Sequence, residues 1–301
     1  MTEAGGEPPQ DRPKLSVVAP IYNEQGAVRE LVERIVAAVG GTGLSYEVIV
    51  ADDCSDDDSA AILVELQAEE TVGEHLRVER LPRNRGQFQA TVYGLAASRG
   101  DSVVVLDGDL QDPPELIVEL VAAMDAAADG VDVVYATKDR RDDPAWFLAG
   151  RAVFAATQAA LSDASIPAGA GSYVIISRDL AQRAARVRLE DANLAAVLAA
   201  LGASATTIPY DKAARYDSSS RVGPWGLLRE AVGSMMLTGA LARLLRWLWM
   251  AASISLGVLW AVGCLSCCSW LQTALLVIIA LGVGVEGGVR NKVRNALAEA
   301  R

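Results

Sequence analysis

The sequence predicts an α/β fold, in which helices cover both faces of a mostly parallel sheet. Five short apolar runs alternate with segments of helical periodicity, and strands that alternate with helices in this way form right-handed βαβ units. The 301 residues are 51% hydrophobic, which is enough to bury a large core. The formal net charge of -11 argues against a protein that binds nucleic acid by broad phosphate neutralisation.

Local patterns define the expected elements in chain order. Residues 15–19 form an apolar run that Pro20 ends, and residues 25–39 place apolar side chains on one helical face. Further strands are expected over residues 46–51, 76–81, 103–106 and 132–136. Further helices are expected over residues 59–68, 87–98 and 113–127.

The C-terminal region differs in composition from the rest of the chain. Residues 247–285 are 39 consecutive uncharged residues, and as helix they would extend about 58 Å, too long for one membrane span and close to two. We therefore expect a two-helix transmembrane hairpin over residues 243–290, although a buried helical pair of a soluble protein would show the same pattern. Basic residues flank both ends of the hairpin, so the positive-inside rule places both ends in the cytoplasm.

These patterns divide the chain into five expected parts. They are a flexible N-terminus without a secretory signal (1–13), the α/β domain (14–222), an amphipathic juxtamembrane helix (223–242), the hairpin (243–290) and a basic cytoplasmic tail (291–301). This organisation predicts a multi-pass protein of the inner (cytoplasmic) membrane with its α/β domain in the cytoplasm. Glycines within the hairpin allow close helix packing, which is compatible with a homo-oligomer.

Acidic side chains follow two of the expected strands. Ligands of a parallel sheet bind at the carboxyl ends of its strands. Asp107 and Asp109 follow the fourth strand, with the amide of Gln111 two residues further on, and such oxygen ligands suit Mg²⁺ or Mn²⁺ bound to the phosphates of a substrate. A solvated turn would show the same spacing. Asp53 follows the second strand, where a carboxylate can accept hydrogen bonds from a base or a ribose.

Basic side chains follow two other strands. They are Arg83, Arg85, Lys138, Arg140 and Arg141. These residues are either solvated surface charges or, in so acidic a chain, the local cations that a polyanionic substrate needs. No glycine-rich phosphate loop follows the first strand, which disfavours a P-loop or a classical dinucleotide-binding fold.

Four segments taken in order carry a family resemblance. They are Val18–Glu24 (VAPIYNE), Asp52–Ser55 (DDCS), Arg83–Gln87 (RNRGQ) and Asp107–Glu115 (DGDLQDPPE). In this order they resemble the family 2 glycosyltransferases, which have the Rossmann-like GT-A fold. Within that family the chain looks most like the polyprenyl-phosphate glycosyltransferases, the group of bactoprenol glucosyltransferase and dolichyl-phosphate mannose synthase. With the C-terminal hairpin, the similarity extends from about residue 14 to residue 290.

The resemblance implies roles for individual residues. It places Asp107, Asp109 and Gln111 at a Mg²⁺ or Mn²⁺ ion and the donor diphosphate, and it implies catalytic roles for Asp107, Asp109 and Arg215. The residues implied to bind the nucleotide sugar are Pro20, Tyr22, Glu24, Asp53, Arg85, Lys138, Arg141, Ser220 and Arg221. The implied donor is a UDP- or GDP-sugar, and the implied acceptor is a polyprenyl phosphate (undecaprenyl or decaprenyl phosphate) in the membrane.

One segment departs from the pattern of that group. Where the group typically reads Asp-x-Gly-Asp-Phe-Arg, residues 169–174 read Gly-Ala-Gly-Ser-Tyr-Val, which removes two acids and an arginine from the acceptor side. A hydroxyl acceptor needs a general base, whereas a lipid phosphate, with a second pKa of about 6, is already largely dianionic at neutral pH. The loss is therefore better tolerated in an inverting transferase with a phosphate acceptor. The alternatives are transfer to a glycan or small-molecule hydroxyl, and nucleotide-sugar binding without turnover.

Overall fold

The computed structural model describes the α/β domain in most detail. The described residues are 12–128, 130–138, 160, 166–167, 169–187, 189, 192–210, 235, 239, 243–244, 247, 250, 291, 293–298 and 300. Apart from a few single positions, the expected juxtamembrane helix (223–242) and hairpin (243–290) lie outside these residues. Among the described residues, no helix combines the length and the apolar character that crossing a bilayer requires.

Seven strands of the described chain form one sheet, in the order β3-β2-β1-β4-β6-β5-β7. The pairs β1/β2, β1/β4, β2/β3 and β5/β7 are parallel, and β6 is antiparallel to both β4 and β5. The strands are β1 (Leu15–Ile21), β2 (Tyr46–Asp52), β3 (Leu76–Arg80), β4 (Ser102–Val105), β5 (Val133–Lys138), β6 (Val174–Ser177) and β7 (Ala205–Tyr210). The predicted mostly parallel sheet is confirmed. The last two strands add to the five predicted ones.

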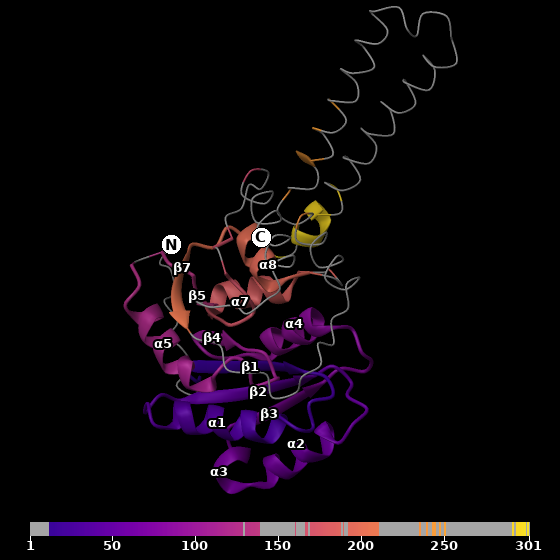
Figure 1. Cartoon of the computed structure of the whole chain (residues 1–301), viewed down its shortest axis with the longest axis vertical. Coiled ribbons are helices and arrows are strands. Elements are labelled where there is room, and N and C mark those ends of the chain that lie inside the picture. Colours follow the sequence, from indigo (N-terminus) through magenta and orange to yellow (C-terminus); the bar gives the residue numbers. More distant parts are fainter. Residues whose placement is uncertain are drawn as a thin grey trace, which may run out of the picture.

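Helices cover both faces of the sheet, as predicted (Figure 1). One face carries α1 (Val28–Gly40), α2 (Ser59–Ala68), α3 (Glu70–Gly73), the 3-10 turn η1 (Pro114–Leu116) and α5 (Ile117–Asp125), and the other carries α4 (Gln87–Ala97), α7 (Arg178–Ala185) and α8 (Leu194–Ala200). Successive side chains of a strand point to opposite faces. In β1, Val17 and Ile21 therefore pack in the core beneath α1, while Val18 packs in the core beneath α4.

The predicted end of the first strand and the predicted start of the first helix are both wrong. The strand continues through Pro20 to Ile21, because β4 pairs with β1 only as far as Val18, so the missing amide hydrogen of Pro20 interrupts no hydrogen bond to β4. The helix begins at Val28 instead of residue 25, because the preceding residues form a turn in which the Glu24 carbonyl accepts from the amides of Ala27 and Val28.

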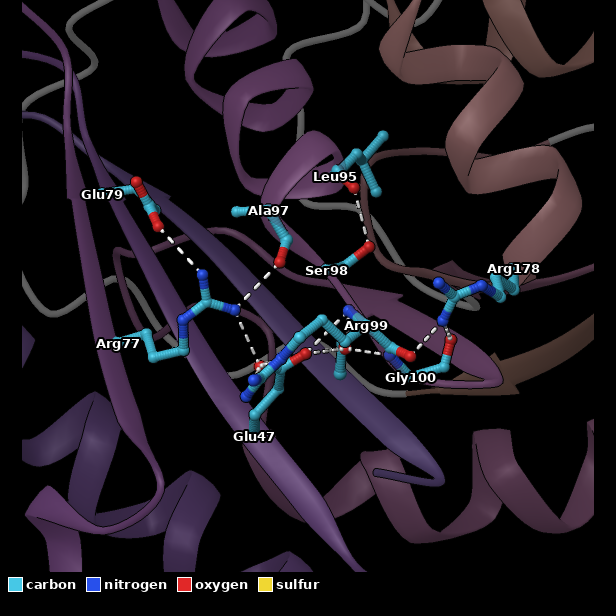
Figure 2. A network of polar contacts seen from close by, with 10 residues as sticks. Glu47, Arg77, Glu79, Leu95, Ala97, Ser98, Arg99, Gly100 and Arg178 are labelled. Carbon is cyan, nitrogen blue, oxygen red and sulfur yellow. Dashed lines mark hydrogen bonds and ion pairs between the residues drawn. The ribbon is translucent and has the colours of Figure 1, made fainter. Parts of the chain in front are cut away.

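A buried carboxylate organises the amino end of the sheet (Figure 2). Glu47 of β2 is 3% exposed and accepts hydrogen bonds from the Ser16 hydroxyl at 2.7 Å, from Arg77 Nη1 at 3.0 Å and from Arg99 Nε at 3.0 Å. The Arg99 amide also donates to Glu47, at 2.8 Å. Arg178 donates in turn to the backbone carbonyls of residues 99 and 100. These contacts fasten β1, β2, β3 and the turn after α4 to one another.

The described part of the C-terminal segment packs against the α/β domain. Residues 293–298 are helical, and Leu297 and Ala300 are buried in the same core cluster as α7 and α8. Arg183 of α7 donates to the Ala300 carbonyl at 3.1 Å. The segment expected as a basic cytoplasmic tail therefore contains a docked helix, and its compartment stays a prediction.

Candidate active site

The carboxyl ends of four parallel strands bring the predicted motifs together. β3, β2, β1 and β4 are neighbours in the sheet and run in the same direction, so the segments after them emerge at one edge. These segments contain Tyr22 and Glu24 after β1, Asp53 after β2, Arg85 after β3 and Asp107 to Gln111 after β4. This confirms the shared strand edge on which the predicted site depends.

The loops after β1 and β2 are fastened to each other. The Asn23 amide donates to Ser55 Oγ and the Glu24 amide donates to Ser59 Oγ, both at 2.9 Å. The Asp56 amide donates back to Asn23 Oδ1 at 3.0 Å. Asn23 has a left-handed φ of 56°, which this pair of loops stabilises. Tyr22, at the start of the first loop, is 36% exposed.

Asp53 holds the loop between β3 and α4. Its two carboxylate oxygens accept from the amides of Arg85 and Gly86, each at 2.7 Å. Gly86 has a φ of +90°, which favours glycine there. Burial raises the pKa of the Asp53 carboxyl, although the two amides favour its charged form. Asp53 thus positions the basic loop, while Arg85 itself is exposed.

Asp107 and Asp109 lie on a tightly packed turn after β4. Asp107 Oδ1 accepts from Gln87 Nε2 at 2.7 Å, and Asp109 Oδ1 accepts from the Gln111 amide at 3.1 Å. Both aspartates are partly exposed. A Cβ on the intervening Gly108 would lie 2.7 Å from Ile21 Cγ2 and 2.9 Å from the Pro20 carbonyl oxygen, so only glycine fits without displacing β1. The Pro20 backbone therefore lies against this turn.

The end of this turn is fixed by two tyrosines. The Tyr173 hydroxyl donates to the Pro113 carbonyl at 2.8 Å, and the Tyr210 hydroxyl donates to Asp112 Oδ1. The two rings meet edge to face, with centroids 5.9 Å apart. Burial raises the pKa of both tyrosine hydroxyls, with the charge of Asp112 adding to the effect, so both stay protonated hydrogen-bond donors.

The carboxylates of the turn fit a divalent cation shared with a substrate. Among the described residues, no group of three or more His, Cys, Asp or Glu side chains is placed to hold a metal by itself. Mg²⁺ is commonly bound by one or two carboxylates, with substrate phosphates and water completing the shell. Two partly exposed aspartates one residue apart match that donor set. Gln111 is 6% exposed, and its Nε2 atom has no hydrogen-bond partner among the described residues. Its role as a metal ligand stays a prediction.

Of the remaining predicted site residues, the structure describes only Lys138. Lys138 is the last residue of β5 and pairs with Tyr210 of β7. Because β4 and β5 are both antiparallel to β6, this end of β5 lies at the same sheet edge as Asp107. The predicted site residues Arg141, Arg215, Ser220 and Arg221 lie outside the described residues.

The segment that departs from the family pattern also reaches this edge. β6 begins at Val174, which pairs with Val105 at the end of β4. A Cβ on Gly169 would lie 3.4 Å from the Thr137 Cβ atom of β5, so the segment runs beside that strand. Ser172 is half-buried just before the strand. Sequence reasoning assigned no roles to Gln87, Asp112, Tyr173 and Tyr210, because their partners are distant in the chain.

Comparison with known proteins identifies the family. The sequence profile of glycosyl transferase family 2 matches residues 16–184, more than half of the chain. The chain belongs to glycosyl transferase family 2. Residues 16–184 include every described residue of the candidate site except Tyr210, so the candidate site lies almost entirely within the matched family 2 domain.

Curated relatives match less than half of this chain. The undecaprenyl-phosphate 4-deoxy-4-formamido-L-arabinose transferase of Sodalis glossinidius (strain morsitans) is 45% identical over 134 residues, which are 44% of this chain and 39% of the relative. The transferase of the same name from Klebsiella pneumoniae is 45% identical over 130 residues, 43% of this chain and 38% of the relative. The chain thus matches about two fifths of the length of these relatives.

Solved structures share the GT-A fold. A glucosyl-3-phosphoglycerate synthase from Mycobacterium tuberculosis, in complex with Mn²⁺ and UDP-glucose, superposes with a TM-score of 0.53 and 22% identity over 75% of this chain and 79% of the synthase. A mannosyltransferase from Pyrobaculum calidifontis, in complex with GDP-Man and Mn²⁺, gives a TM-score of 0.53 and 19% identity over 97% of this chain and 86% of the enzyme. At these identities the likeness concerns the fold.

Proposed function

We propose that this chain transfers a sugar from a nucleoside diphosphate sugar to the phosphate of a polyprenyl phosphate, with Mg²⁺ or Mn²⁺ at Asp107 and Asp109. The observation that carries the proposal is the turn from Asp107 to Gln111, which presents two partly exposed carboxylates at the sheet edge where the other loops meet. The polyprenyl phosphate acceptor is supported by the names of the curated relatives.

Different described residues would bind different parts of the donor. The fastened loops after β1 and β2 would hold the nucleoside, with the partly exposed Tyr22 at their start. Asp53 would keep the loop with Arg85 in place at the same edge. A divalent cation bound at Asp107 and Asp109 would neutralise charge on the diphosphate as it leaves.

The transfer needs no proton from the acceptor. A phosphate oxygen of the lipid attacks C1 of the sugar, the bond from C1 to the diphosphate oxygen breaks, and its electron pair leaves with the nucleoside diphosphate. Attack from the opposite side inverts the configuration at C1. A phosphate with a second pKa of about 6 is largely dianionic at neutral pH. Ser172 in place of an acid is therefore compatible with this acceptor.

The membrane would bring this acceptor to the sheet edge. We propose that residues 243–290 span the membrane as a hairpin with the catalytic domain on the cytoplasmic side, because the 39 uncharged residues are flanked by basic ones. The helical residues 293–298 pack on the core beneath α7 and α8, so a hairpin that precedes them would be joined directly to the catalytic domain.

The test is transfer by the full chain in detergent or vesicles. Radiolabelled UDP- and GDP-sugars are incubated with undecaprenyl phosphate and Mn²⁺ or Mg²⁺, with an EDTA arm and the Asp109→Asn variant as controls. The expected result is a metal-dependent, lipid-extractable product from at least one donor, which the variant does not form. If a glycan is added to the reaction and only its hydroxyls become labelled, the lipid acceptor is rejected. Donor binding without any product would reject turnover.

A further inference from the structure

The turn that carries Asp107 and Asp109 is attached, at its C-terminal end, to the part of the sheet that contains β6 and β7. The Tyr173 hydroxyl reaches the Pro113 carbonyl at 2.8 Å, and the Tyr210 hydroxyl reaches the Asp112 carboxylate. Asp112 and Tyr173 are each 1% exposed, and Tyr210 is 7% exposed. Since Tyr173 immediately precedes β6 and Tyr210 ends β7, both hold the turn from the side opposite to β1.

The backbone just before these attachments is in a conformation that needs support. Leu110 has a φ of 58°, in the left-handed region that residues other than glycine rarely adopt. It lies directly between Asp109 and Gln111 and packs in the same core cluster as Tyr173 and Tyr210. Such backbone conformations persist only where the surrounding structure fixes them, and they are common where ligands bind.

We propose that Tyr173 and Tyr210 are positioning residues that hold the turn in the shape that presents Asp107 and Asp109 to a cation and a diphosphate. The proposal rests on the proposed donor site and deepens it. Gly108 packs against β1 on one side, and the two tyrosines hold the other end, so Asp109 lies between two fixed points and Asp107 directly precedes the first of them. Groups that orient metal ligands in this way commonly contribute tenfold to a hundredfold to metal affinity.

The hydroxyl of Tyr173 distinguishes this chain from the group that it resembles. Tyr173 stands where the resembling group typically has phenylalanine, whose ring could pack in the same place but could not donate to Pro113. The hydroxyl also lies in the segment that has lost the usual acids. We infer that this chain fixes the turn through hydroxyl contacts from the acceptor side of the site.

Calorimetric binding of UDP and GDP to the full chain tests the proposal, with and without Mn²⁺. The variants are Tyr210→Phe and Tyr173→Phe, which keep the rings, and the matched control is Tyr135→Phe in β5. Tyr135 is 2% exposed and packs in the core cluster on the other face of the sheet from Tyr173 and Tyr210. Thermal unfolding reports whether each variant is folded. Where Tyr210→Phe does not fold, Tyr173→Phe carries the test, because it leaves the Asp112 contact intact.

We expect Tyr210→Phe to weaken Mn²⁺-dependent nucleotide binding at least about tenfold and Tyr173→Phe about threefold, while binding in EDTA changes less than about twofold. A purely structural role would shift the unfolding temperature and leave the Mn²⁺-dependent part of the binding unchanged. If both folded tyrosine variants bind nucleotide with Mn²⁺ as well as Tyr135→Phe does, the proposal is overturned. That result would leave the proposed donor site intact. If the wild-type chain binds neither nucleotide with Mn²⁺, the proposed donor site itself fails and this proposal fails with it.

Discussion

The two ends of the sheet both hold carboxylates, but in different surroundings. At the amino end, Glu47 is 3% exposed and contacts Ser16, Arg77 and Arg99 (Figure 2). At the carboxyl end, Asp107 and Asp109 are partly exposed, and the described contacts at their Oδ1 atoms come from amide groups. The difference teaches that a buried carboxylate with arginine partners stabilises the fold, whereas a partly exposed carboxylate can reach a ligand.

The largest effect is expected at the carboxyl end. Replacing Asp109 or Asp107 by asparagine removes a charged oxygen ligand from the proposed cation site, and we expect transfer activity to fall on the order of 100-fold or more. Asp101→Asn, which changes an exposed aspartate paired with Lys14 near the amino end, is the control and should keep full activity. Initial rates at saturating donor and acceptor measure both effects. Equal losses in all three variants would remove the distinction between the two ends.

The next effect is expected in stability at the amino end. Glu47→Gln leaves Arg77 and Arg99 without their buried anionic partner, and we expect it to lower the free energy of unfolding by about 2 kcal/mol. The figure lies below the range for fully buried pairs because the arginines are 35% and 59% exposed. Urea unfolding measures the change. Nucleotide binding by the folded variant should equal that of the wild type, and a selective loss of binding would contradict the assignment of Glu47 to the fold.

The same residue predicts how the stability depends on pH. Burial alone would raise the pKa of Glu47, but hydrogen bonds from Ser16, Arg77 and Arg99 outweigh it and hold the pKa below its ordinary value. A carboxyl whose pKa is lower in the folded state stabilises the fold above its unfolded pKa and loses that contribution as the pH falls through the folded pKa. The stability difference between wild type and Glu47→Gln should therefore be constant from pH 7 to pH 6 and shrink from about pH 5 downwards. A difference that grew on acidification would contradict this account.

The smallest effect is expected from packing at the carboxyl end. A methyl group on Gly108 would meet β1 at 2.7 and 2.9 Å, so Gly108→Ala should displace the turn and weaken Mn²⁺-dependent nucleotide binding about tenfold. Gly26→Ala is the matched control, because a Cβ there meets no atom within 4 Å. Calorimetry on both variants compares them directly. Identical binding would mean that the turn tolerates displacement and that its position is not set by β1.

Much of the carboxyl end could be predicted from local sequence. The helix over residues 59–68 has the predicted bounds, and the motifs meet at one sheet edge because parallel neighbours place their carboxyl ends together. Periodicity finds such elements because each one buries its own apolar face. The acidic motif could be placed for the same reason, since it directly follows a buried strand.

Two strands in the other half of the sheet, β6 and β7, could not be predicted in this way. The alternation of strands and helices implies parallel neighbours, but β6 enters between β4 and β5 in the opposite direction. β7 is mostly exposed along its length and carries no strong apolar run. The contacts of Tyr210 with Asp112 and of Tyr173 with Pro113 join residues 98 and 60 positions apart, and local patterns carry no information about such pairs.

The central claim is that the turn after β4 holds a divalent cation together with the diphosphate of a nucleotide. Its most direct test is a crystal structure of the full chain grown with UDP or GDP and Mn²⁺, with data collected to locate manganese by anomalous scattering. The account predicts one manganese peak at a coordination distance from carboxylate oxygens of Asp107 or Asp109 and from a phosphate oxygen of the nucleotide. Nucleotide bound at the sheet edge with manganese elsewhere, or with both aspartates turned away from it, would contradict the account.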